Sequence, residues 1–129
     1  MGNTIAEKIL SNHAHKMLKA GDIAVCDVDF CFGQDGTSSI IIDSFRKLGV
    51  DKAFDPSKFY MIIDHSAPSP NMGVSEIHRK MRLFAKEFGV GMYDVGCGVC
   101  HQLVPQKGHV TCGDIVLGAD SHTCTYGAI

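Results

Sequence analysis

Hydrophobic and polar positions along this 129-residue chain follow two different periods, and each change of period predicts an element. Apolar residues three and four apart predict helices over about residues 4–19, 37–48 and 74–88. The first helix opens on a capping box formed by Thr4 and Glu7. Alternating or continuous apolar runs predict strands at residues 23–30, 59–63, 90–95 and 115–119. Residues 31–36, with two glycines, are predicted to be a loop.

Alternation of these strands and helices predicts the fold class. Strands separated by helices are typical of α/β proteins, so we expect a mostly parallel sheet in a three-layer α/β/α arrangement. The sequence contains no internal repeat, low-complexity tract or linker. Residues 1–129 are therefore predicted to form a single α/β domain.

Composition restricts the classes of partner. The chain is 45% hydrophobic and 20% charged with a net charge of −2, so no basic surface for nucleic acid or anionic membranes is expected. No apolar run approaches the ~20 residues that span a bilayer. Charged residues interrupt the N-terminal segment, which excludes a signal peptide and predicts a cytoplasmic protein. Six cysteines are then expected to be reduced thiols.

Polar side chains follow each apolar strand in turn. In a parallel sheet, the carboxyl ends of the strands meet at one edge, where ligands bind in open α/β folds. This distribution predicts an active-site rim. Its members are Gln34-Asp35, Asp64-His65, His101-Gln102 and Asp120-Ser121-His122.

Structural explanations compete with the functional ones at these strand ends. Asp64 and His65 form either a proton-transfer pair or an Asx turn that leaves the strand. Asp120 could cap a following helix, although capping gives no reason for His122. Gln34 could position a substrate carboxylate, whereas Asp35 could serve as a helix cap.

The pattern Cys97-x-x-Cys100-His101 leaves three interpretations open. It matches c-type haem attachment, half of a zinc or iron–sulfur site, or a glycine-rich turn with incidental thiols. Haem attachment normally requires export, and a closed metal site needs a second cysteine pair, so we favour the turn. The remaining histidines are predicted to be ordinary surface residues: His13, His15, His78 and His109.

Four of these segments together resemble the aconitase family, especially its isopropylmalate and homoaconitate branch. Residues 118–128 are similar to the family's Asp-Ser-His-Thr signature, and Asp64-His65 followed by Pro68 is similar to its Asp-His segment. Residues 98–102 resemble its Gly-Ile-x-His-Gln stretch, and residues 34–37 its first substrate-contact loop. The motifs occur in the family's order and cover essentially the whole chain.

The resemblance implies a hydro-lyase that interconverts hydroxy-acid isomers, with a [4Fe-4S] cluster as cofactor. The substrate would be a small hydroxy-di- or tricarboxylate, and 2-isopropylmalate to 3-isopropylmalate is the expected conversion. His65, paired with Asp64, would protonate the departing hydroxyl. His101 and Asp120 would form a second pair near the iron-bound water. Gln34, Ser121 and His122 would bind substrate carboxylates.

One part of the family's pattern lies outside this sequence. Its three cluster cysteines follow the Asp-Ser-His-Thr motif at a distance, so none of the present cysteines is assigned as a ligand. We therefore expect an N-terminal part of a larger aconitase-type subunit, inactive alone and partnered by a separate small (swivel) subunit. Homoaconitate or aconitate hydratase, and a non-catalytic metal- or thiol-binding module, remain alternatives.

Overall fold

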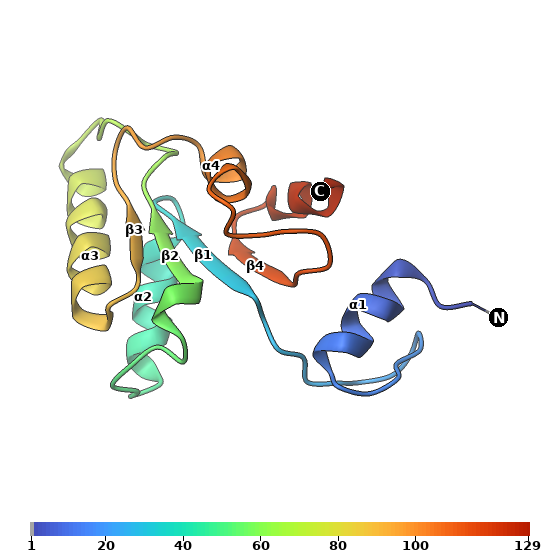
Figure 1. Cartoon of the computed structure of the whole chain (residues 1–129). Helices are drawn as coiled ribbons and strands as arrows, with labels where there is room; N and C mark the ends of the chain where they lie inside the picture. The colour runs from blue at the N-terminus through green and yellow to red at the C-terminus, as the bar shows by residue number, and fades with distance from the viewer. Residues whose placement is uncertain (1) are drawn as a thin grey trace.

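A four-stranded, all-parallel sheet forms the centre of the computed structural model, which describes residues 2–129 (Figure 1). The strand order is β3-β2-β1-β4, and β1 pairs with both β2 and β4. Cys31 of β1 is in register with Phe59 of β2 and Leu117 of β4. The strands are β1 (Phe30–Gln34), β2 (Phe59–Ile62), β3 (Gly91–Tyr93) and β4 (Val116–Ala119).

Helices cover both faces of the sheet, which confirms the predicted three-layer α/β/α class. One layer holds α2 (Ser38–Lys47) and α3 (Met72–Phe88); the other holds α4 (Cys100–Gln106) and the 3-10 helix η2 (Thr123–Ala128). Alternation along β2 separates two cores, because successive side chains of a strand point to opposite faces. Met61 packs with α2 and α3, whereas Ile62 packs with α4 and η2.

The sequence prediction is wrong for the first strand, which is displaced toward the carboxyl side of residues 23–30. Phe30 and Phe32 are each 2% exposed and anchor β1 in the core, whereas Ile23 and Val25 are more than 90% exposed. Alternation alone therefore predicted a strand where no neighbouring strand is present to pair with it. Residues 31–34, predicted to lie in a loop, belong to β1; Gly33 there lets Ile41 of α2 approach closely.

Two helical predictions also need correction. The first helix, α1 (Ile5–His13), has the predicted capping box but ends well before residue 19. It ends there because the hydroxyl of buried Ser11 accepts the backbone N–H of Leu18, which folds the chain back. Residues 100–106 form α4, although glycines and Pro105 indicated a turn. The other predicted helices and strands are confirmed within a few residues; η1 (Pro56–Lys58) precedes β2.

Residues 2–29 extend away from the sheet (Figure 1). Asp29 anchors this arm: its carboxylate accepts the backbone N–H of Ile115 at 2.7 Å and lies 2.6 Å from Nε2 of His13. Across the described residues 2–129, no helix has the length and apolar character needed to cross a membrane.

Candidate active site

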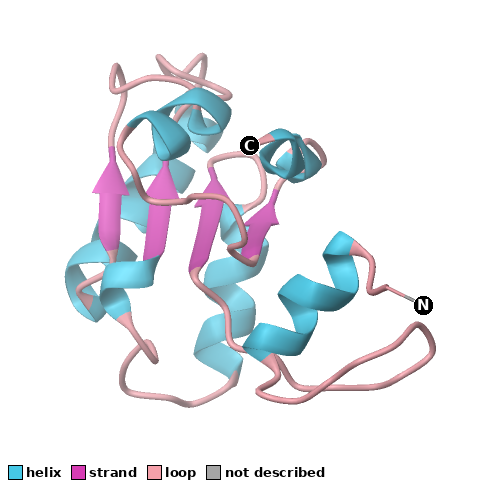
Figure 2. Cartoon of the chain, turned by 45° about the vertical axis from the view of Figure 1, so that its right-hand side comes forward, coloured by secondary structure: helices cyan, strands magenta, loops and turns pink. Residues whose placement is uncertain are grey.

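The seven residues to which the resemblance assigns roles gather at the carboxyl edge of the sheet. The four strands point the same way in Figure 2, and the loops that leave them lie at the same end. We call this group the strand-end cluster: Gln34, Asp64, His65, His101, Asp120, Ser121 and His122.

Asp64 and His65 form a pair directly after β2. Nδ1 of His65 lies 2.8 Å from Oδ1 of Asp64, while Oδ2 of Asp64 accepts the backbone N–H of Cys100 at 2.6 Å. The Asp64 side chain is only 2% exposed, whereas that of His65 is 36% exposed. The buried carboxylate therefore fixes one nitrogen of a ring whose other side is accessible.

Asp120 is the centre of the cluster, and its side chain is 4% exposed. Oδ1 lies 2.7 Å from Nε2 of His101, in an ion-pair contact whose N–H is not aligned for a hydrogen bond. The same oxygen accepts the backbone N–H of His122 at 2.8 Å. Oδ2 lies 3.3 Å from Nε2 of His65 and accepts Nε2–H of Gln34 at 3.4 Å. One carboxylate thus joins the ends of β1, β2 and β4 to α4.

These contacts set the charge of the cluster. Burial alone would lower the pKa of His65, but the hydrogen bond and charge of Asp64, with the charge of Asp120, raise it above its ordinary value. Burial alone would raise the pKa of Asp120, but the backbone N–H of His122 and the charge of His101 hold it below its ordinary value. These contacts therefore favour the protonated form of His65 and the ionised form of Asp120.

Ser121, His122 and Gln34 border this charged centre differently. Ser121 and His122 are exposed, with Oγ of Ser121 3.2 Å from Nδ1 of His122 and 73% of the His122 side chain accessible. Gln34 is 5% exposed, and its carbonyl oxygen accepts the backbone N–H of Gly36. An amide carries two N–H donors, so the bond to Asp120 leaves Gln34 a second donor.

Sequence reasoning missed the role of Asp35. It is no helix cap, because Thr37 occupies the N-cap position of α2. Its buried carboxylate instead accepts the backbone N–H groups of Asp64, His65 and Ser66 at 3.1, 2.9 and 2.7 Å. The partners are 29 to 31 residues away in sequence, so no local pattern could have shown them.

Three of the four histidines predicted to be ordinary surface residues are not. His78 is 2% exposed, His109 stacks on Phe30 at 5.2 Å between ring centres, and His13 pairs with Asp29. His15, whose side chain is 77% exposed, matches the prediction. Periodicity placed these rings on helix faces or in a turn, but the direction of each ring depends on its neighbours in space.

Comparison with known proteins identifies the family. Residues 7–129 match the aconitase family (aconitate hydratase). The chain belongs to the aconitase family. It is 45% identical over its whole length to the 3-isopropylmalate dehydratase large subunit 1 of Methanopyrus kandleri, of which it covers 31%. It is 46% identical to large subunits from Elusimicrobium minutum and Thermotoga maritima, of which it covers 31% and 30%. The chain thus spans about a third of the length of the relatives it matches.

Aconitase-family proteins generally use a [4Fe-4S] cluster, which is held by cysteine thiolates. Two groups within residues 2–129 bring together three side chains that could ligate a metal: Asp64, His65 and Cys100, and His101, Asp120 and His122. They contain one cysteine between them, and burial together with Asp64 raises the pKa of the Cys100 thiol. The described residues therefore do not fit the ligand set of such a cluster.

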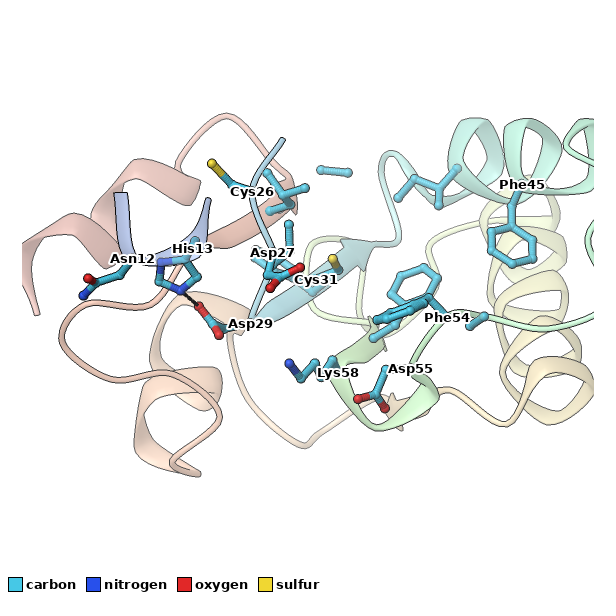
Figure 3. A pocket seen from close by; sticks show the side chains of 18 of the residues that line it. Asn12, His13, Cys26, Asp27, Asp29, Cys31, Phe45, Phe54, Asp55 and Lys58 are labelled. Carbon is cyan, nitrogen blue, oxygen red and sulfur yellow. Dashed lines mark hydrogen bonds and ion pairs between the residues drawn. The ribbon is translucent and has the colours of Figure 1, made fainter. Parts of the chain in front are cut away.

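A second concave region lies beside the arm and contains none of the strand-end cluster. We call it the apolar groove: Ile41, Phe45, Phe54, Phe59 and Leu117, bordered by arm residues such as His13 and Asp29. Figure 3 shows the rings of Phe45 and Phe54 at one end and the His13–Asp29 pair at the other. Its lining is mostly apolar, and its His13–Asp29 pair lies at one end.

Proposed function

We propose that this chain is the N-terminal part of the large subunit of a hydro-lyase that interconverts 2-isopropylmalate and 3-isopropylmalate by dehydration and rehydration, in leucine biosynthesis. The observation that carries the proposal is the bridge from Asp64 through His65 to Asp120. It is supported by 45–46% identity to proteins named 3-isopropylmalate dehydratase large subunit. The names of these relatives favour this activity over the alternatives, which are homoaconitate hydratase and aconitate hydratase.

His65 supplies the proton-transfer step in this proposal. Hydroxide is a poor leaving group, so elimination requires a proton on the departing oxygen. A protonated His65 donates it from Nε2, the hydroxyl leaves as water, and Asp64 holds the ring through Nδ1. The raised pKa of His65 favours the acid form of the ring, which this step needs. The reverse transfer, from water to the ring, serves rehydration.

The remaining cluster residues bind and orient the substrate. Ser121 and His122 are exposed at the rim and provide hydroxyl and imidazole donors for carboxylates of a small hydroxy acid. Gln34 contributes an amide N–H from the end of β1. His101 is held against Asp120. The two form a second acid–base pair, which moves protons to and from the water that elimination releases.

Other functions belong to protein outside residues 1–129. The [4Fe-4S] cluster and its cysteine ligands, the base that removes the carbon-bound proton, and selection of the substrate side chain are assigned to the rest of the large subunit and to a small subunit. Six free thiols favour a reducing compartment such as the cytoplasm. Neither nucleic acid nor a membrane is a proposed partner.

A chimera tests this proposal. Residues 1–129 replace the matching N-terminal third of the Thermotoga maritima large subunit, and the product is combined with that organism's small subunit after anaerobic treatment with iron and sulfide. We expect turnover of 3-isopropylmalate by the chimera and none by the 129-residue chain. His65→Gln in the chimera should lower kcat by roughly 10²- to 10⁴-fold, the usual contribution of a general acid.

His15→Gln is the matched control, because His15 also pairs with an aspartate but lies on the exposed arm. It should leave kcat unchanged. A chimera that shows cluster absorbance but no turnover would refute the proposed activity. Equal turnover by wild type and His65→Gln would remove the proton-transfer role of His65. Turnover by the isolated chain would refute its assignment as one part of a larger subunit.

A further inference from the structure

The Asp35 carboxylate is buried, and its hydrogen bonds go to a different loop. Its side chain is 1% exposed. Oδ1 accepts the N–H groups of Asp64 and His65, and Oδ2 accepts that of Ser66. Burial alone would raise the pKa of Asp35, but these three N–H groups hold it below its ordinary value. An ionised carboxylate thus holds three consecutive backbone amides in place.

His78 lies behind this carboxylate on α3. Its side chain is 3% exposed, and Nε2 lies 3.6 Å from Oδ2 of Asp35. Nε2 is buried and makes no hydrogen bond within residues 2–129. A buried nitrogen without a closer partner costs free energy, so its position facing Asp35 requires an explanation.

Fold stability alone explains these groups poorly. The hydrogen bonds converge on the short stretch that carries the Asp64–His65 pair, which occupies the turn between β2 and α3. The Asp64 side chain is held separately, through the backbone N–H of Cys100 at the start of α4. Asp35, after β1, holds the backbone of residues 64–66, and the start of α4 holds the Asp64 carboxylate. The direction of the His65 ring is therefore determined from two sides.

We propose that Asp35, backed by His78, is a positioning residue for the Asp64–His65 pair. The hydrogen bonds of Asp35 go to the backbone of residues 64–66 rather than to the His65 ring, and its charge also raises the pKa of that ring. Loss of its charge frees this turn, and Nε2 of His65 is no longer held at 3.3 Å from Asp120. Small displacements of a proton donor have large effects on rate, because proton transfer requires close approach.

Asp35→Asn tests the proposal in the 129-residue chain by NMR. Asparagine keeps the volume, but its NH₂ faces at least one of the three donors. Amide hydrogen exchange at Asp64, His65 and Ser66 should accelerate about 10- to 100-fold, the equivalent of losing charge-assisted hydrogen bonds. The titration midpoint of the His65 ring should fall as well, because the charge of Asp35 also raises the pKa of this ring. The exchange rates of the three amides are therefore the readout of positioning.

Asp43→Asn is the matched control, because Asp43 lies exposed on α2. It should leave the three amides and the His65 titration unchanged. A folded Asp35→Asn chain with wild-type exchange at residues 64–66 would overturn the proposal.

His78→Gln keeps the proposal testable if Asp35→Asn does not fold. This variant retains all three hydrogen bonds to Asp35 but removes the imidazole behind them. Exchange at residues 64–66 should accelerate about 2- to 5-fold, again with a shifted His65 midpoint. Unchanged values for both would overturn the role of this pair. The inference rests on the proposed function only in using His65 as the proton donor, and the NMR test needs no turnover, so the two can fail separately.

Discussion

The strand-end cluster and the apolar groove both border β1 and β4, but they treat polar and apolar groups in opposite ways. In the cluster, the carboxylates of Asp64 and Asp120 are almost fully buried, and each is paired with backbone N–H groups and imidazoles. In the groove, Phe54 is fully exposed and Leu117 is 56% exposed. Polar groups are thus buried in the cluster, whereas apolar groups are exposed in the groove.

This contrast shows which of the two regions finds its packing and hydrogen-bond partners within the described residues. Buried carboxylates persist only where donors surround them, and the donors of the cluster come from four elements of this chain. An exposed apolar surface lacks the partner that would remove it from water. The cluster therefore depends little on further protein, whereas the groove is consistent with our proposal that these residues belong to a larger subunit.

The largest expected effect is on unfolding free energy, and it compares the groove with the buried core on the α2–α3 side of the sheet. Phe84 of α3 is 0% exposed, so Phe84→Ala should destabilise the chain by about 3–5 kcal/mol. Phe54→Ala, the same change in the groove, should stay within about 0.5 kcal/mol. Urea unfolding of both variants measures the difference. A loss at Phe54 comparable to that at Phe84 would show that the groove is already packed in solution.

Asp120→Asn should have an intermediate effect. The substitution keeps the shape but replaces charged contacts to His101, His65 and the backbone N–H of His122 with neutral ones. Since hydrogen bonds to charged groups contribute about 1.5–3 kcal/mol, we expect a loss in that range by urea unfolding.

Asp51→Asn serves as the control for Asp120→Asn, because Asp51 is exposed after α2. Its unfolding free energy should match wild type. If Asp120→Asn were equally neutral, the cluster would not be held together by its central carboxylate, and the contrast with the groove would weaken.

The strand-end cluster could be predicted from sequence because its signal is positional. Gln34, Asp64 and Asp120 follow apolar strands, and parallel strands bring such ends to one edge whatever their order. His101 lies instead on α4, beyond the end of β3. The position of β1 did not matter greatly for this, since Gln34 still ends the strand after the correction. The resemblance added roles, but the gathering of the residues followed from the strand pattern.

Features that depend on distant partners could not be predicted. Asp35 contacts amides about 30 residues away, and His78 acquires its orientation only when α3 packs on the sheet. Helix α4 was missed because Pro105 and nearby glycines locally favour a turn, whereas buried Leu103 and Val104 stabilise the helix against the sheet. Local propensity is weak where tertiary packing decides.

The smallest expected effect, the dependence of stability on pH, compares one histidine from each region. His65 in the cluster and His13 at the groove both have raised pKa values: Asp64 and Asp120 outweigh burial at His65, and the carbonyl of Ile9 and the charge of Asp29 raise that of His13. Each therefore stabilises the fold fully below its unfolded pKa of about 6.5, and this contribution is lost as pH rises through the folded pKa. The pKa of His109 is lowered by burial and by Lys107, so the contribution of this residue to stability should rise with pH instead of falling.

Urea unfolding across this range should show a smaller loss of stability with rising pH for His65→Gln and for His13→Gln than for wild type. The loss should be larger for His109→Gln. If His13→Gln flattened the profile but His65→Gln did not, the His65 charge would be uncoupled from the carboxylates around it, and the cluster would lose the acid form on which its proposed chemistry depends.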